Sequence, residues 1–380
     1  MYDVIIVGAG LVGLAACAGL QRAGFSVALV DARTPDFDVR PRWDTRVYAI
    51  SPGSERFLST LGAWQRLDAE RMSAILRMRV HGDADGMIGF DAYEAGAPRL
   101  ATIVEDSALK QALWQSIDDN DIDLFFGTPP QKLTTHDTHA CLTLAGGHEL
   151  HARLVIGADG IDSWVRSAAN IASSSHHYAV SGLVANFECE RSHQHVAEQW
   201  FLGDSVLAWL PLPQQHISIV WATTEADTLA ALPAEALAQR VDEAGASTLG
   251  QMKLVNRPAV FALQLLRVRS PIAARVALIG DAAHGVHPLA GQGVNLGFLD
   301  AEALLAALTP ARARADVGHA GLLRAYARAR ALDVSAMQLA THGLERLFAQ
   351  HGLSTLRNRG LGLTNSQQAL KNLFIRFAFG

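Results

Sequence analysis

Three glycines near the N-terminus, Gly8, Gly10 and Gly13, separate an apolar run from an Ala- and Leu-rich stretch. This is the spacing of a dinucleotide-binding turn, where glycine permits a tight bend, close approach of a pyrophosphate and close packing of helix on strand. The helix N-terminus would attract the phosphates, and Asp31, about twenty residues on, could accept hydrogen bonds from ribose hydroxyls. The pattern predicts a bound dinucleotide. The alternative is a tight turn that simply requires glycine.

A second group of glycine and polar residues follows another apolar run. Asp281 comes directly after Gly280 at the carboxyl end of a predicted strand, where open α/β sheets bind ligands, so its carboxylate could hold a ribityl chain. The loop that leads into the next helix contains Pro288, Gly291, Gln292, Gly293, Val294 and Asn295. Its free amides could stabilise negative charge on a reduced flavin, and a helix-capping loop is the alternative. The first motif cannot separate NAD from FAD, and this second motif favours FAD.

His284 and His287 have a spacing that suits one helical face and a metal ion, but they precede a proline in a loop and lack carboxylate partners. We therefore expect no metal site. His287, beside Pro288 at the presumed flavin edge, is a candidate polar contact near the reacting ring. A histidine hydrogen-bonded within a tight turn is the alternative. The sequence also contains no second glycine fingerprint for NAD(P)H and no convincing nucleophile with its base.

Hydrophobic periodicity predicts the elements that must position these residues. A strand over 2–7, a helix over 11–23 and a strand over 26–31 form a βαβ unit, which favours a parallel, doubly wound sheet. Ser51 as N-cap and Pro52 at the first helical position predict a helix that ends near Leu61.

The later part of the chain changes pattern twice. An apolar strand over 154–156 and a helix after Val104 are assigned to the first domain, whereas short alternating strands between 179 and 266 indicate a mainly antiparallel second domain. The apolar strand over 276–279 and the helical segment that follows return the chain to the first domain. The polar segment 173–177 is predicted to be a solvated loop.

These elements predict an α/β protein with a Rossmann-like FAD-binding domain, an interleaved substrate domain built on a mainly antiparallel β-sheet, and C-terminal helices. The FAD-binding domain is predicted to comprise residues 1–75, 100–175 and 270–380. The substrate domain is predicted to comprise residues 76–99 and 176–269.

Composition limits the class of protein. The 380 residues are 49% hydrophobic, and the net charge of -5 comes from mixed acidic and basic residues without a basic tract, so no nucleic acid is expected as a partner. Three scattered cysteines favour a reducing cytoplasm. The chain enters a strand pattern at once, and charge interrupts each apolar run before about 18 residues, so we expect neither export nor a spanning helix.

Taken together, the residues resemble the FAD-dependent aromatic hydroxylases with the para-hydroxybenzoate hydroxylase fold, and within them the ubiquinone-biosynthesis hydroxylases. The resemblance spans nearly the whole chain. It rests on Gly8–Gly13, Asp44–Arg46, Ala49, Leu61–Trp64, Val104–Glu105, Gly157–Gly160, Ser163, Arg166, Gly280–Asn295, Leu356–Leu361 and Leu370–Asn372.

The resemblance implies roles for individual residues. Asp31 and Arg46 would contact the adenosine and pyrophosphate portion of FAD, Asp281 the ribityl chain and pyrophosphate, and the loop 291–295 the isoalloxazine ring.

The same resemblance assigns Val104 to the cofactor site, and Asp159 and Gly160 to holding the flavin and the nicotinamide cofactor. Two positions depart from the family pattern: Asp31 stands where Glu is more common, and Asp106 stands where the subgroup usually has Asn.

The activity that the resemblance implies is hydroxylation of a polyprenylated phenol or quinol in ubiquinone biosynthesis. NAD(P)H would bind transiently and reduce FAD, O2 would form a C4a-hydroperoxide, and one oxygen would pass to the ring near His287 and Pro288. The protein's part would be to exclude water, position the ring and stabilise charged flavin states.

The resemblance also implies partners and a location. Other ubiquinone-biosynthesis proteins are expected partners, and the enzyme is expected in the cytoplasm, with peripheral contact at the inner face of the membrane. The segment 370–379 suits a surface-binding helix, and an ordinary amphipathic helix packed on the flavin domain fits equally well. Two other functions stay open: a flavoenzyme of the same fold that hydroxylates a soluble phenol or acts as a reductase, and a flavin-stabilised scaffold without turnover.

Trp200, Trp209 and Trp221 fall on predicted strands of the second domain. They could line an apolar substrate pocket, although aromatic residues on strands are more often core. Cys17 lies within the first helix and is expected to pack rather than to do redox chemistry.

Overall fold

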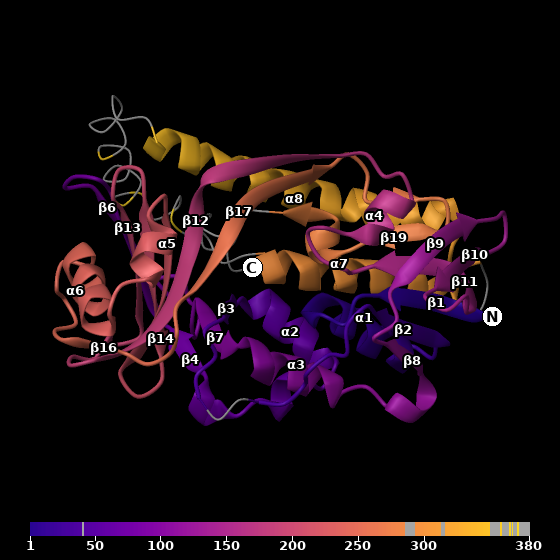
Figure 1. Cartoon of the computed structure of the whole chain (residues 1–380), viewed down its shortest axis with the longest axis horizontal. Coiled ribbons are helices and arrows are strands. Elements are labelled where there is room, and N and C mark those ends of the chain that lie inside the picture. Colours follow the sequence, from indigo (N-terminus) through magenta and orange to yellow (C-terminus); the bar gives the residue numbers. More distant parts are fainter. Residues whose placement is uncertain are drawn as a thin grey trace.

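The glycine turn lies in the predicted βαβ unit, at the carboxyl end of the unit's first strand, which is an interior strand of a mainly parallel sheet (Figure 1). This computed structural model describes residues 1–39, 42–285, 293–312 and 316–349, together with Asn358, Asn365, Gln367 and Lys371. The unit consists of β1 (Tyr2–Val7), α1 (Leu11–Arg22) and β2 (Val27–Asp31), each ending within one residue of its predicted bounds.

The first sheet brings four carboxyl strand ends to one edge. Its order is β18-β19-β11-β1-β2-β8, with β8 (Asp123–Phe126), β11 (Glu149–Gly157), β18 (Ile272–Ala273) and β19 (Val276–Leu278), and the hairpin of β9 (Pro130–Thr135) and β10 (Ala140–Leu144) continues from β11. β1 is parallel to β2 and β11, and β11 is parallel to β19. Gly8, Asp31, Gly157 and Gly280 therefore lie at or just beyond neighbouring strand ends, where such sheets bind ligands.

The second sheet is mainly antiparallel, as predicted. Its order is β20-β17-β12-β15-β14-β13-β5-β6, and β16 pairs with β12. The strands are β5 (Arg77–His81), β6 (Met87–Asp91), β12 (Ser173–Cys189), β13 (Val196–Phe201), β14 (Val206–Leu212), β15 (His216–Thr223), β16 (Met252–Leu254), β17 (Ala259–Val268) and β20 (His284–Gly285). Trp209, Phe187 and residues of α5 (Ala226–Ala230) and α6 (Ala234–Ala244) form a separate apolar core on this sheet.

A small third sheet, β3-β7-β4, joins the two larger ones, with β3 (Val47–Ile50), β4 (Ser73–Ile75) and β7 (Ala101–Glu105). The helices beside it are α2 (Pro52–Thr60), whose cap is Ser51 as predicted, and α3 (Asp106–Trp114); α4 (Trp164–Ala168) follows β11. Single-turn 3₁₀ helices cover Trp64–Arg66, Ala69–Arg71, Asp119–Asp121, Gly280–Ala282 and Thr309–Ala311.

Two long helices pack beside the first sheet and the helix α1. In Figure 1, α7 (Gly293–Leu308) lies between the layer of α1 and α2 and the longer α8 (Ala320–Ala349). Among the described residues, the stretch Gly293–Ala311 is long and apolar enough to cross a membrane. It is nevertheless a core helix, because Phe298, Leu304 and Leu308 pack among the apolar residues of α1 and β1.

One local prediction is wrong. The segment 173–177 is not a loop but the start of β12, paired in register with β17 from Ser173↔Val268 to His177↔Gln264. Its serine and histidine side chains are exposed, so the polar composition reflects a solvated strand rather than missing backbone pairing. The domain boundaries stay a prediction, and we note that β20, from the third predicted segment of the first domain, pairs with β17 in the second sheet.

Candidate functional site

The glycine turn after β1 has no room for a side chain at Gly8 or Gly13, whereas the space beside Gly10 is open. Gly8 has φ +111°, and a Cβ there would lie 2.3 Å from the carbonyl oxygen of Ala158. A Cβ on Gly13 would lie 1.9 Å from the carbonyl oxygen of Gly8, whereas a Cβ on Gly10 would meet nothing within 4 Å. No side chain caps α1 at Gly10, so its first amides can face a ligand there. This is the cradle that a pyrophosphate requires.

Asp31 has a structural task that the sequence did not reveal. Its Oδ2 accepts a hydrogen bond from the amide of Ala9 at 2.8 Å, and its Oδ1 accepts one from the amide of Arg33 at 2.9 Å. The carboxylate thus fixes the glycine turn to the end of β2. Since a carboxylate has about four acceptor positions, ribose contact by Asp31 stays a prediction that this geometry permits.

The second candidate loop follows β11. Asp159 accepts hydrogen bonds from Ser163 Oγ, the N-cap of α4, at 2.5 Å and from the amide of Val165 in the first turn of α4 at 3.0 Å. Burial raises the pKa of Asp159, and these hydrogen bonds oppose the shift. Gly160, with φ +81°, has open space where a Cβ would lie. Any flavin contact in this loop is therefore better suited to the backbone of Gly160 than to the Asp159 carboxylate.

Arg166 connects this loop to the third one. Its guanidinium is buried and donates to the carbonyl oxygens of Ile161 at 2.8 Å and Ala282 at 3.1 Å. The two loops that follow β11 and β19 are thereby held at a fixed separation.

We expect Arg166→Lys to destabilise the apoprotein by roughly 2 kcal/mol and to weaken FAD binding about 10-fold, because an ammonium cannot span both carbonyls. Chemical unfolding and FAD titration measure the two effects. Arg79→Lys, which alters a half-exposed ion pair with Glu198, is the matched control and should change stability by less than about 0.5 kcal/mol. Equal behaviour of the two variants would remove Arg166 from the site.

Asp281 and Arg46 face the same edge. The Asp281 side chain is exposed, yet the surrounding protein removes part of its hydration, and this desolvation raises the pKa of Asp281. The positive charges of His284 and Arg46 act in the opposite direction and lower the pKa. A ligand can therefore reach the Asp281 carboxylate, which water solvates poorly. The Arg46 guanidinium lies 5.3 Å from the centre of the Tyr48 ring, and the Tyr48 hydroxyl donates to Asp106 at 3.0 Å.

Buried polar contacts hold the segment that carries Arg46. Glu105 accepts from the amide of Asp44 at 2.7 Å and from Arg71 Nε at 2.7 Å. Asp44 in turn accepts from the amide of Ser107 at 2.6 Å. These contacts explain why Asp44 and Glu105 accompany Arg46 in the sequence pattern.

Of the remaining residues predicted to contact the cofactor or the reacting ring, some are described by the structure and some lie outside the described part of the chain. The Asn295 amide donates to the carbonyl of Ala49 at 2.8 Å and accepts from the amide of Ser51 at 2.9 Å, so it fastens α7 to β3 and α2. Val104 is buried in β7, and Gly293 and Val294 begin α7. The predicted residues His287, Pro288, Gly291 and Gln292 lie outside the described residues.

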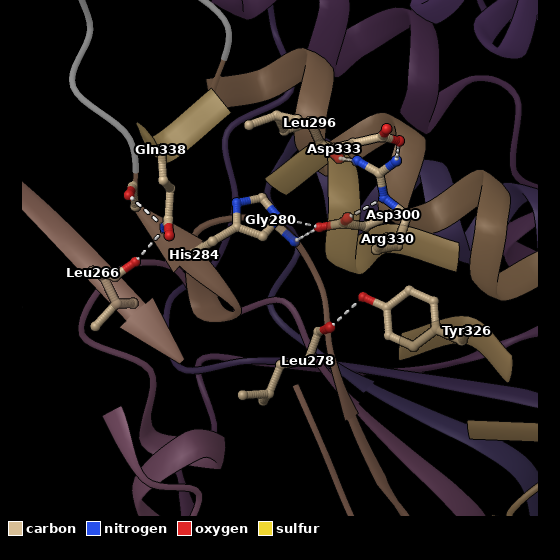
Figure 2. Close-up of polar contacts among 11 residues, drawn as sticks. Leu266, Leu278, Gly280, His284, Leu296, Asp300, Tyr326, Arg330, Asp333 and Gln338 are labelled. Atoms are coloured by element: carbon tan, nitrogen blue, oxygen red, sulfur yellow. Dashed lines mark hydrogen bonds and ion pairs between the residues drawn. The ribbon is translucent and has the colours of Figure 1, made fainter. Parts of the chain in front are cut away.

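His284 does have a carboxylate partner, contrary to the expectation from its neighbours in sequence. Its Nε2 lies 2.6 Å from Asp300 Oδ2, a residue of α7 that sequence reasoning did not single out (Figure 2). Arg330 of α8 donates to the other Asp300 oxygen at 2.8 Å. The only available signal was an acidic residue within the apolar helix, since a buried acid requires partners.

The tryptophans are core residues of the second sheet. Trp200 and Trp209 pack edge to face with ring centres 4.6 Å apart, and Trp221 is 5% exposed. Trp221 borders a recess of about 460 Å³, which Arg240 and Glu225 also line and to which none of the predicted cofactor residues contributes. Cys17 is fully buried in α1, as predicted.

Comparison with known proteins agrees with this geometry. Residues 1–340 match the family described as the FAD binding domain. The chain is 34% identical over 388 residues to the 3-demethoxyubiquinol 3-hydroxylase of Escherichia coli, covering 100% of this chain and 98% of that protein. It is 33% identical to the ubiquinone hydroxylase UbiL of Rhodospirillum rubrum, covering 100% and 89% of the two chains.

Solved structures share the fold. A probable FAD-dependent monooxygenase from Pseudomonas aeruginosa has a TM-score of 0.78 at 23% identity, covering 96% of this chain and 100% of that one. The p-nitrophenol 4-monooxygenase of Pseudomonas putida has a TM-score of 0.80 at 16% identity, covering 100% and 98%. At these identities the likeness concerns the fold alone.

Proposed function

We propose that this chain inserts one oxygen atom into the ring of a prenylated phenol or quinol, because it belongs to the FAD-dependent hydroxylases of ubiquinone biosynthesis. The observation that supports this proposal most strongly is the match to the Escherichia coli relative, which covers 100% of this chain and 98% of that protein. A dinucleotide cradle alone would not distinguish a hydroxylase from other flavoenzymes, because one fold serves many reactions.

The described residues fit FAD. The turn at Gly8 and Gly13 excludes side chains, Gly10 and Gly160 border open space, and Asp281 is exposed at the same sheet edge. The chemistry that FAD supplies when bound is acceptance of a hydride from NAD(P)H and activation of O2.

The chain's own residues would bind and orient the cofactor. The amides at the start of α1 would attract the pyrophosphate, and Asp31 holds the turn that presents them. Asp281 would accept hydrogen bonds from ribityl hydroxyls, while Arg46 offsets its negative charge.

We further propose peripheral contact with a membrane and with other ubiquinone-biosynthesis proteins, because a polyprenyl tail partitions into lipid. Lys371, from the segment predicted to bind the surface, instead pairs with Glu94 at 3.1 Å and is buried. This contact favours the alternative of a helix packed on the protein at residue 371.

Quinone analysis of cells that lack this protein tests the proposed function. We expect ubiquinone to fall and a prenylated phenol lacking one ring hydroxyl to accumulate, and the position of the missing hydroxyl identifies the carbon attacked. Expression of the wild-type chain should restore ubiquinone. Normal ubiquinone in cells without the protein would assign the hydroxylase to a different aromatic substrate.

A further inference from the structure

Asp300 is a fully buried acid that three groups contact from three different elements. Its Oδ2 accepts hydrogen bonds from the amide of Gly280 at 2.9 Å and from His284 Nε2 at 2.6 Å. Its Oδ1 accepts one from Arg330 Nε at 2.8 Å. Figure 2 shows the carboxylate between the turn after β19 and the helix α8. Burying such a charge is costly unless partners satisfy it, and here both oxygens are engaged.

The contacts of Asp300 fix the turn that presents Asp281. Gly280 has φ +61°, a left-handed conformation, and its amide is held by Asp300. Asp281 follows directly, so the direction of its side chain depends on how this amide is held. His284 begins β20 at the other end of the same turn and is bonded to the same carboxylate oxygen.

Helix α8 supports the turn from behind. The Tyr326 hydroxyl donates to the carbonyl of Leu278 at 2.7 Å, just before the turn, and Gln338 Nε2 donates to the carbonyl of Gly285 at 3.2 Å, just after it. Arg330, between them on α8, contacts Asp300 and also Asp333 at 2.6 Å.

We propose that Asp300 is a positioning residue for FAD, acting through Gly280 and His284, and that Arg330 holds it in place. This inference rests on the FAD binding stated above and deepens it. It assigns to α7 and α8 a part in cofactor binding, although neither Asp300 nor Arg330 needs to touch the cofactor.

The charges around His284 predict a pH signature. Burial alone would lower the pKa of His284, but the charge and hydrogen bond of Asp300, aided by Asp281, outweigh it and raise the pKa above its usual value. Burial alone would raise the pKa of Asp300, which His284 and Arg330 hold below its usual value. The charged and titratable groups on the surrounding elements are Asp281, Asp300, Tyr326, Arg330 and Arg267. Arg267 is the residue of β17 that pairs with His284 of β20.

A protonated His284 forms an ion pair with Asp300, which holds the turn that carries Asp281, and loss of the His284 proton weakens that pair. The affinity of the wild type for FAD should therefore fall as pH rises through the pKa of His284. In Asp300→Asn this ion pair is absent and burial lowers the pKa of His284, so the fall in FAD affinity should be missing from the neutral pH range.

The experiment compares Asp300→Asn with Asp333→Asn by FAD titration of the folded apoproteins across the neutral pH range. Both substitutions are isosteric and remove one carboxylate from Arg330, but the Asp333 side chain is 57% exposed. We expect Asp300→Asn to bind FAD about 10-fold more weakly or worse, and Asp333→Asn to stay within about 2-fold of the wild type.

Two further variants separate positioning from general stability. Tyr326→Phe removes a buried α8 contact and should lower the unfolding free energy while leaving the pH profile of FAD affinity unchanged. If Tyr326→Phe reproduces both effects of Asp300→Asn, Asp300 is merely structural and the proposal is overturned. If Asp300→Asn does not fold, His284→Gln decides: retention of the wild-type pH profile overturns the proposal, and its loss supports it.

None of these titrations requires an aromatic substrate. A wild-type protein that binds FAD but hydroxylates nothing would contradict the proposed function and leave this inference standing, whereas an Asp300→Asn variant with wild-type FAD affinity and pH profile would contradict the inference alone.

Discussion

Gly13→Ala should lower the unfolding free energy of the apoprotein by about 3 kcal/mol and abolish FAD retention, because its Cβ would lie 1.9 Å from a backbone oxygen that cannot move freely. Gly10→Ala should lower the unfolding free energy by less than about 1 kcal/mol, because Gly10 has φ -76° and open space at the Cβ position. The new methyl group would nevertheless occupy the space that the pyrophosphate needs, so FAD affinity should fall at least about 10-fold. Chemical unfolding and FAD titration measure the two quantities separately.

The contrast between these glycines distinguishes a cofactor cradle from a turn that requires glycine only for its own geometry. Gly89→Ala is the control, because Gly89 also has open space at its Cβ position but lies in β6 of the second sheet. It should leave FAD affinity unchanged. If Gly10→Ala binds FAD as tightly as Gly89→Ala does, the cradle is not where the pyrophosphate binds.

Asp281→Asn should stabilise the apoprotein at neutral pH while weakening FAD binding at least about 10-fold. Desolvation raises the pKa of Asp281 in the folded protein, so the charged form opposes folding above that pKa. This penalty is absent at pH values below the unfolded pKa of about 3.9, where both states bind the proton, and it appears as pH rises through the folded pKa. The asparagine variant removes the penalty but also the acceptor for ribityl hydroxyls.

Thermal unfolding as a function of pH, combined with FAD titration, measures both effects. The stability gain of Asp281→Asn should shrink as the pH approaches about 4. Asp31→Asn is an informative control because the Asp31 carboxylate is hydrogen-bonded to two backbone amides, so its loss should destabilise the turn. An Asp281→Asn variant that is less stable than the wild type at neutral pH would show that this carboxylate is well solvated or paired.

The parts of this fold that could be predicted from sequence are those fixed by local pattern. The unit from Tyr2 to Asp31 has strand and helix periodicity on both sides of its glycines, and Ser51 with Pro52 specifies a helix start by backbone chemistry alone. The segment 173–177 failed the same reasoning because its side chains are polar on a solvated strand, so composition masked the pairing with β17.

The functional site was only partly predictable because several of its contacts join distant segments. Asp300 and Arg330 are thirty residues apart, and Arg166 reaches Ala282 over 116 residues. Asp159 and Asn295 are predicted to contact the cofactor, and the structure shows that their side chains also fasten neighbouring elements. Sequence motifs therefore predicted loops that the structure places beside one another after neighbouring strands, whereas the side-chain contacts that hold those loops became visible only in the three-dimensional structure.

We propose that this chain uses FAD and O2 to hydroxylate a prenylated ring. The most direct test is to incubate the purified, FAD-loaded protein with NAD(P)H, isotopically labelled O2 and a short-chain prenylated phenol, and to measure the product by mass spectrometry. We predict a product with one additional hydroxyl whose oxygen carries the label. A hydroxyl oxygen derived from water, or oxidation of NAD(P)H without any hydroxylated product, would contradict the account.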